Sequence, residues 1–441
     1  MNLDGFALPV QKLKGTDPVK ALDLSDKSLG VASGVVIASL IGVNGALTAL
    51  NLSSNQIGGH WDGSEMVSTP EGPKAIADAL LASGTLTKIE YVCQTCVMAS
   101  HLQTQPLRSL MLHSVSYNNF NQAASLGLLV AMKGKSMESI GMAGCCLGEE
   151  GVKVVAEMAS VMGALERLDV RNNKIAADGA AQLSAAVLGN IKIEMFNKIP
   201  IKEMRANSFT ELDLKEKLVG VEGGIVIAGL IPFMGALTKL SLAENQLEEK
   251  GTEAICEALK QNNTLKELDL SGFPLSSNIG GAAGAKHVAD MLGVNGGLMV
   301  TNLLRNHLDA ESAKLLTGVA KQKDISLCGI RRDQTTADFS HQYLKPPDVI
   351  LLASDLSQTV VTGGLTSIDL SENNLTNYGK DHMTGITELA SALAVNGALT
   401  KCDLRRNHMS EEGEASIRKA VEGRAGFKLH LDLRYRPVRP A

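Results

Sequence analysis

The stretch Leu237-Thr-Lys-Leu-Ser-Leu-Ala-Glu-Asn-Gln-Leu247 decides the fold of this chain. It places leucine at the first, fourth, sixth and eleventh positions of a frame, with asparagine at the ninth. The frame recurs, with apolar replacements, from Leu47, Met137, Leu165, Leu365 and Leu399, and the Met137 copy has Cys145 in place of asparagine. Weaker copies begin at Val19, Leu86, Leu107, Phe209, Leu265 and Leu298. Such recurrence indicates a repeat protein.

The interval between frames is regular, because Phe209, Leu237 and Leu265 begin frames 28 residues apart. Alternating leucines predict a short strand with one buried face. The asparagine stands where the chain leaves the strand, so its amide can hydrogen-bond the backbone of the neighbouring unit. The second half of a unit has a helical period, as in 251–260. One strand and one helix cannot bury their own apolar faces, so the units must stack.

This pattern resembles the ribonuclease-inhibitor-like class of leucine-rich repeat proteins, a class with ribonuclease inhibitor, Ran GTPase-activating proteins and NLR-type repeat arrays among its members. The resemblance covers the chain from about Val19 to Leu433. It implies an α/β leucine-rich repeat solenoid shaped like a horseshoe, with parallel strands on the concave face and helices on the convex face. The motif is specific for the fold and unspecific for function.

We predict a single array over 1–441, with repeats over about 19–433 and a short frayed tail over 434–441. Three strand motifs lack the asparagine and precede a very apolar run: Leu22-Asp-Leu24, Leu212-Asp-Leu214 and Ala337-Asp-Phe339. We interpret them as the starts of three internal blocks, 19–208, 209–333 and 334–433. Internal duplication would account for the blocks.

Two coils are too short for a full unit. Ile193 and Phe209 are only 16 residues apart, and the stretch from Ile325 to Thr336 is similarly cramped. Pro200 also argues against a helix in the first of them. At both places we expect a strand with a tight return and no outer helix, and the array can bend there.

Composition narrows the class of protein. The chain has 441 residues, of which 44% are hydrophobic and only 3% aromatic, and its formal net charge is −5. Without a basic excess, nucleic-acid binding is not expected. The N-terminus lacks a basic region followed by a long apolar run, and no apolar run is long enough to span a membrane, so we expect neither a secretory signal nor a membrane anchor. Seven cysteines, an odd number, fit a reducing, cytoplasmic location.

The motifs that usually carry chemistry are incomplete in this sequence. Gly134-Lys-Ser136 lacks the earlier glycine of a phosphate loop, because Leu129 stands there. Cys93-Gln-Thr-Cys96 is a lone pair, without a second pair at zinc-finger spacing. Recurring aspartates such as Asp169 and Asp269 follow from the repeat position rather than from acid–base chemistry. We therefore predict no catalytic, cofactor or metal site, and no enzyme.

The side chains that flank the strand leucines should point away from the core. We predict that a partner binds these concave-face residues: Arg167, Asp169, Arg171, Glu211, Asp213, Lys215, Lys239, Glu267, Asp269, Lys401, Asp403 and Arg405. A second candidate is the insertion over 58–73, where His60 and Trp61 stand. A solvated strand face without a partner, and a surface loop without a function, are the structural alternatives.

Mixed charge on the predicted face suits a protein partner with complementary charges. The leading hypothesis is a non-catalytic protein–protein interaction scaffold whose partner the sequence does not identify. The resemblance to Ran GTPase-activating proteins implies a regulator of a small GTPase as the alternative. The resemblance to ribonuclease inhibitor implies, third, a nuclease inhibitor.

Overall fold

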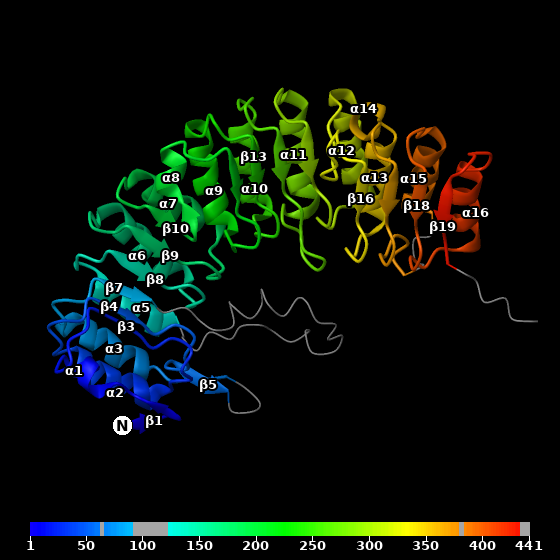
Figure 1. Ribbon diagram of the computed structural model, residues 1–441. Coiled ribbons are helices and arrows are strands. Elements are labelled where there is room, and N and C mark those ends of the chain that lie inside the picture. Colours follow the sequence, from blue (N-terminus) through cyan, green and yellow to red (C-terminus); the bar gives the residue numbers. More distant parts are fainter. Residues whose placement is uncertain (62–65, 91–121, 379–382, 433–441) are drawn as a thin grey trace, which may run out of the picture. The chain divides into compact units, whose positions relative to one another are not determined.

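The computed structural model describes residues 1–61, 66–90, 122–378 and 383–432. The chain forms two compact units. The first comprises Met1–Ala206 and Leu218–Gly229, and the second comprises Asn207–Lys217 and Leu230–Ala441. In each unit short strands alternate with helices along the chain, as the repeat frame predicts (Figure 1).

The first unit opens with a short hairpin and helix: β1 (Asn2–Leu3), β2 (Phe6–Ala7) and α1 (Val10–Lys14). Its parallel strands are β3 (Ala21–Asp23), β4 (Ala49–Asn51), β7 (Lys88–Glu90), β8 (Ser139–Gly141), β9 (Arg167–Asp169) and β10 (Met195–Phe196). Its longer helices are α2 (Val31–Ile41), α3 (Glu71–Ala82), α5 (Gln122–Met132), α6 (Gly148–Val161), α7 (Ala177–Gly189) and α9 (Gly220–Leu230). A separate antiparallel hairpin, β5 (Gly59–Trp61) and β6 (Met66–Ser68), precedes α3.

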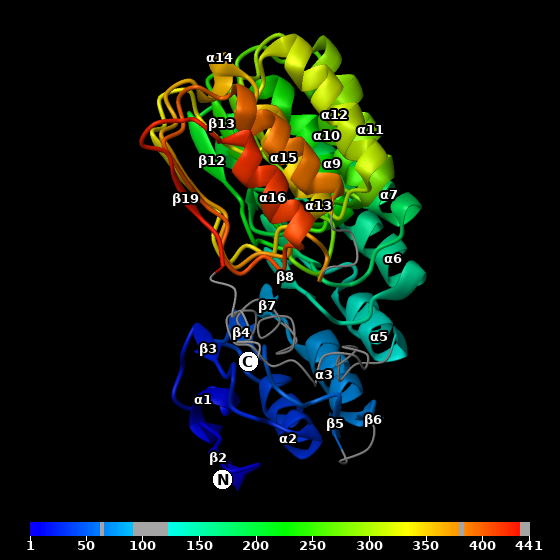
Figure 2. The ribbon, with the colours of Figure 1, turned by 90° about the vertical axis from the view of Figure 1, so that its right-hand side faces the viewer.

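The second unit holds eight strands among its described residues: β12 (Glu211–Asp213), β13 (Lys239–Ser241), β14 (Glu267–Asp269), β15 (Val300–Asn302), β16 (Thr336–Asp338), β17 (Ser367–Asp369), β18 (Lys401–Asp403) and β19 (Lys428–His430). The elements between them are η2 (Ile231–Phe233), α10 (Glu248–Leu259), α11 (Gly281–Val294), α12 (Ala310–Lys323), α13 (Pro346–Leu356), α14 (Thr359–Thr362), α15 (Thr384–Val395) and α16 (Glu411–Ala420). Figure 2 shows these helices stacked on one side, with β12, β13 and β19 on the other.

Three sheets carry the repeats. The first runs from β3 to β11 (Ile199–Pro200), the middle sheet from β12 to β15, and the third from β16 to β19. Neighbouring strands are parallel except β10 and β11, and each middle residue faces the middle residue of the next strand, as Leu212 faces Leu240. Within each sheet the middle residues of the strands point toward the helices, and Leu240 of the middle sheet is 1% exposed.

An asparagine ladder ties each coil to the one before it. The Asn55 amide donates to the carbonyl oxygens of Leu24 at 2.8 Å and Leu52 at 3.0 Å, and its Oδ1 accepts the Leu29 amide at 2.9 Å. The same reach to a preceding coil recurs at Asn173, Asn245, Asn306, Asn373 and Asn407. The first strand of each sheet has no preceding coil in its own sheet. Those three coils therefore need no ladder asparagine.

A second asparagine ladder, which the frame did not predict, covers the C-terminal ends of the helices. The Asn44 amide donates to the Lys12 carbonyl at 2.9 Å, and its Oδ1 accepts the Leu47 amide at 3.0 Å. Equivalent amides donate to the carbonyls of a preceding helix end from Asn190, Asn295 and Asn396. They satisfy carbonyls that every helix leaves without an internal partner. The sequence signal is an asparagine three residues before a frame begins.

The structure corrects one expectation about the short coils. Residues 195–200 make the predicted tight return as the antiparallel pair β10–β11, but a short helix, α8 (Ile201–Arg205), follows it. Pro200 immediately precedes α8, a position where proline fits a helix because no amide is needed there. Buried Ile201 and Met204 anchor this helix. The second short coil has no helix between Ile325 and Thr336, as predicted.

Candidate functional site

Two rows of side chains stand on the face of each sheet opposite the helices, because strand residues alternate. We call the first residue of each strand the leading row: Ala21, Ala49, Lys88, Ser139, Arg167 and Met195, then Glu211, Lys239, Glu267 and Val300, then Thr336, Ser367, Lys401 and Lys428. The third residues form the trailing row: Asp23, Asn51, Glu90, Gly141 and Asp169, then Asp213, Ser241, Asp269 and Asn302, then Asp338, Asp369, Asp403 and His430.

The trailing-row aspartates are engaged in the turns that end the strands. The carboxylate of Asp269 accepts the amide of Ser271 at 2.9 Å, and that of Asp369 accepts the amide of Ser371 at 2.9 Å. Asp23, Asp213 and Asp338 make the same bond two residues on. The Ser340 hydroxyl and amide hold the pKa of Asp338 below its usual value. These aspartates recur because the turn needs an acceptor.

Two arginines of the predicted surface are bound to trailing-row aspartates. The Arg171 guanidinium donates to the Asp169 carboxylate from Nε at 2.8 Å and from Nη2 at 2.7 Å. The Arg405 guanidinium donates to the Asp403 carboxylate from Nε at 3.0 Å and from Nη2 at 2.6 Å. Arg171 is only 8% exposed and Asp403 only 2%. The Arg405 side chain is itself exposed, so Arg171 is the less accessible of the two arginines, and partner binding by both stays a prediction. Bidentate pairing of this kind fixes both groups in the turn.

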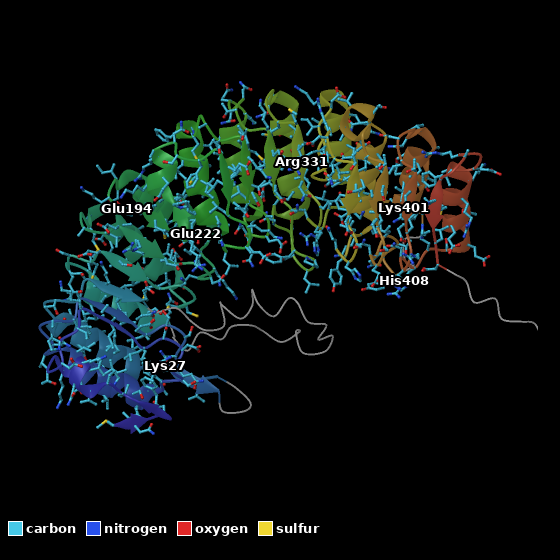
Figure 3. All side chains as sticks on the ribbon, viewed as in Figure 1. Lys27, Glu194, Glu222, Arg331, Lys401 and His408 are labelled. Carbon is cyan, nitrogen blue, oxygen red and sulfur yellow. The ribbon has the colours of Figure 1, made fainter. Side chains whose placement is uncertain are left out.

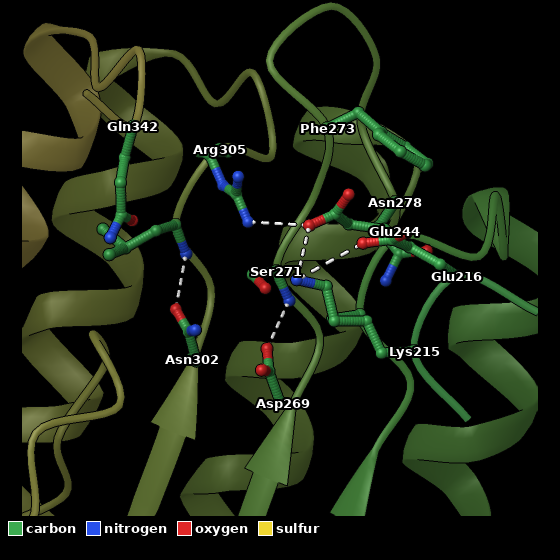
Figure 4. A network of polar contacts seen from close by, with 12 residues as sticks. Lys215, Glu216, Glu244, Asp269, Ser271, Phe273, Asn278, Asn302, Arg305 and Gln342 are labelled. Atoms are coloured by element: carbon green, nitrogen blue, oxygen red, sulfur yellow. Dashed lines mark hydrogen bonds and ion pairs between the residues drawn. The ribbon is translucent and has the colours of Figure 1, made fainter. Parts of the chain in front are cut away.

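Lys215, another predicted residue, belongs to a network in the second unit (Figure 4). The Glu244 carboxylate is 5% exposed and lies between the Lys215 ammonium at 3.2 Å and the Arg305 guanidinium at 2.9 Å. Burial works to lower the pKa of Lys215, but Glu244 outweighs it and the pKa is raised. Through these two ion pairs the buried Glu244 carboxylate links its own coil to the coils of Lys215 and Arg305.

In the leading row of the middle sheet, charged side chains form ion pairs with neighbouring residues of opposite charge. The Lys239 ammonium lies 3.6 Å from Glu267, and the Arg331 guanidinium approaches the same carboxylate at 4.0 Å. Glu211 faces Lys239 in register. Arg331 is labelled in Figure 3. Its approach to Glu267 was not predicted, because Arg331 belongs to a coil that lacks the repeat frame.

Of the other leading-row cations, Lys88 pairs with Glu138 at 2.9 Å, whereas Arg167, Lys401 and Lys428 make no ion pair among the described residues. Arg167 is exposed, without an ion pair in that part of the chain, and lines a hollow of about 530 Å³ on the strand face of the first unit. Glu90, Ser139 and Asp169 also line it. Lys401 is exposed in the second unit and faces Lys428 in register. Lys428 was missed by sequence reasoning, although it directly precedes the predicted terminal strand.

Several predicted features lie outside the described residues. The backbones of His60 and Trp61 lie in β5, but their side chains are outside the description, as are Cys93, Cys96 and the tail 434–441. Within the described ranges, histidine, cysteine, aspartate and glutamate form no group of three or more placed to hold a metal ion. None of the helices there combines the length and apolar character needed to cross a bilayer.

A family model described as "Leucine Rich repeat" matches residues 46–59 and 165–184. The chain is a leucine-rich repeat protein. Its parallel strands alternate with helices, as the ribonuclease-inhibitor-like resemblance implied.

This leucine-rich repeat protein has distant relatives in the same class. It is 27% identical over 201 residues to human "NACHT, LRR and PYD domains-containing protein 13", which covers 41% of this chain and 19% of that protein. It is 25% identical over 332 residues to pig "Ribonuclease inhibitor", which covers 73% of this chain and 66% of the inhibitor. The chain thus matches between about a fifth and two thirds of their lengths. Among solved structures, the leucine-rich repeat-containing protein LegL7 from Legionella pneumophila is 14% identical, with a TM-score of 0.28, over 92% of this chain and 98% of its own.

Proposed function

We propose that this protein is a non-catalytic scaffold that binds a protein partner through its strand faces. One observation carries the proposal: Arg167 and Lys401 are exposed on strands and make no ion pair within 4.0 Å among the described residues, although most charges around them are paired. Charged side chains held on a rigid backbone give specificity and steer association. The name of the pig relative describes an inhibitor of ribonuclease, which is a protein target.

The chemistry of the two rows supports a protein partner over a nucleic acid. Acidic side chains such as Glu211 and Asp213 are exposed on the same faces as the cations. A phosphate backbone needs a run of positive charge, which this face lacks. The proposal of a non-catalytic role is supported by the trailing-row aspartates, since their engagement in turns leaves them poorly placed to move protons.

Charge reversal tests the proposal without disturbing the fold. We expect the double variant Arg167→Glu/Lys401→Glu to lose a partner that the wild-type chain captures from a lysate and then binds as a purified protein. Arg171 and Arg405 are left unchanged, because reversing them would break their bonds to Asp169 and Asp403. The loss should reach about tenfold or more in affinity for two contacts of this kind.

The matched control is Lys192→Glu/Lys314→Glu, which makes the same charge change at exposed positions, one in each unit, away from the strand faces. Equal binding by wild type and both variants would refute the strand-face proposal. Stimulated GTP hydrolysis by the purified partner would favour a GTPase regulator, and inhibited nuclease activity would favour a nuclease inhibitor.

A further inference from the structure

Two lysines stand side by side at one edge of the third sheet. Lys401 of β18 and Lys428 of β19 are register partners, and strands in a sheet lie about 4.8 Å apart. Both side chains are exposed, and neither has an ion pair or hydrogen bond among the described residues. Like charges directly opposite one another destabilise a sheet. The equivalent row of the middle sheet avoids this, because Lys239 meets Glu267.

The nearby acidic groups have other partners. Asp403 is held by Arg405, Asp369 accepts both the amide and the hydroxyl of Ser371, and Asp432 accepts the Arg406 amide at 2.8 Å. The segment that follows β19, residues 433–441, contains three arginines and neither aspartate nor glutamate. Lys401 and Lys428 are therefore left with a positive charge that the described chain does not neutralise.

We propose that Lys401 and Lys428 form the docking point for an acidic protein segment, one that carries at least two neighbouring carboxylates. This proposal rests on the proposed function and names the chemistry of its partner. The charges are complementary, because one carboxylate between the two ammonium groups, or one on each, removes the repulsion between the lysines. The ammonium groups lose little of their hydration in such a contact. Lysine stems are flexible enough to adjust to the spacing.

The trailing row makes a nucleic acid the poorer fit. Asp369 and Asp403 lie two residues beyond the leading row on their strands, with their oxygens turned toward the strand ends. A continuous phosphate backbone laid over the lysines would run beside the half-buried Asp369 carboxylate. A short acidic peptide can place its carboxylates on the lysines without carrying a continuous line of negative charge past Asp369.

A labelled peptide tests the proposal directly. The probes are fluorescein-labelled hexaglutamate, hexalysine and a thymidine oligonucleotide of the same charge, titrated with the full chain in an anisotropy assay at low salt. We expect hexaglutamate to bind, and Lys401→Gln/Lys428→Gln to weaken its binding about tenfold, because both lysine contacts with the peptide are lost. Lys321→Gln/Lys323→Gln, which removes two exposed charges from α12, should leave binding within about twofold.

A second measurement does not need a ligand. Lys428→Gln should raise the thermal midpoint at low salt, because it removes the repulsion with Lys401, and about 0.5 M salt should abolish the gain. Hexaglutamate that fails to bind, equal weakening by both double variants, or an oligonucleotide that binds as tightly as the peptide would each overturn the proposal. The scaffold proposal is judged separately, because Arg167→Glu alone should not change peptide binding.

Discussion

Asp355 of α13 is fully buried, and its carboxylate holds the short coil that follows α12. It accepts hydrogen bonds from the Ser326 hydroxyl at 2.7 Å, the Leu327 amide at 2.9 Å and the Cys328 amide at 3.1 Å. Burial raises the pKa of Asp355 from 3.8 to about 6, although these donors work to lower it. The folded protein therefore binds more protons than the unfolded chain between these two pH values.

The titration of Asp355 makes the free energy of unfolding depend on pH. Asp355 contributes its stability fully below the unfolded pKa of 3.8, and that contribution is lost as the pH rises through about 6. Asp355→Asn does not titrate, so the excess stability of wild type over this variant should be larger near pH 5 than near pH 7.5, by roughly 1–3 kcal/mol. Urea unfolding of both proteins across this range measures the difference. A difference that does not change with pH would contradict the assignment.

At the scale of single residues, the sequence predicted where the charged side chains lie better than which of them are bound to other residues of the chain. Nine of the twelve charged residues lie in strands as predicted, because alternation decides which side a strand residue takes, but Arg171, Lys215 and Arg405 lie in the turns that follow the strands. The sequence could not show that Arg171 folds back on Asp169, since that bond depends on the turn geometry after the strand. The burial of Glu244 and the exposure of Lys428 depend in the same way on coils that are distant in sequence.

At the scale of the element, the packing of α3 against the turn residue Ile57 depends on a glycine. A Cβ added to Gly72 in α3 would lie 2.2 Å from the Ile57 carbonyl oxygen and 2.8 Å from its Cγ2. Backbone cannot yield as a flexible side chain does, so Gly72→Ala should destabilise the first unit by about 1–3 kcal/mol. Gly127 of α5 has nothing within 4 Å of an added Cβ. Gly127→Ala should therefore stabilise by about 0.5–1 kcal/mol, through helix propensity alone.

Thermal or urea unfolding of the two alanine variants checks this contrast, since the same chemical change has opposite expected signs. Two variants that both stabilise the protein would show that Ile57 and α3 can move apart at little cost. Two variants that both destabilise it would show that the exposed Gly127 position needs glycine for another reason.

The repeat frame predicted the strands and helices of the regular units, but it did not predict the elements that lie outside a regular unit. The helical period over 251–260 corresponds to α10, and the frame at Leu237 contains β13. The insertion over 58–73 gave no repeat signal, and its hairpin β5–β6 was not foreseen. For α8, the rule that proline breaks a helix was applied to a proline that precedes one.

At the scale of the whole molecule, each sheet ends with an arginine in place of a further asparagine. Arg205 donates to the Leu188 carbonyl at the end of α7, Arg332 to the Asp324 carbonyl after α12, and Arg424 to the Leu393 carbonyl in α15. The blocks 19–208, 209–333 and 334–433 stay a prediction, but a shared terminal device is what a repeated block would carry. Guanidinium groups suit the task because their several donors reach the carbonyls of a helix end.

Arg424 shows what such a device does for a solenoid. Among the described strands β19 pairs with β18 alone, so the coil that carries β19 depends on that interface. Arg424 bonds the Leu393 carbonyl at 2.9 Å and lies 4.4 Å from the Phe427 ring, which joins the last coil to α15. Arg424→Met keeps the apolar contact but loses the donors. We expect the amides of α16 and β19 to exchange hydrogen at least about tenfold faster in this variant, while those of the middle sheet keep their rates. Uniformly faster exchange would instead mean that the second unit unfolds as one body and that Arg424 contributes to its overall stability rather than closing its end.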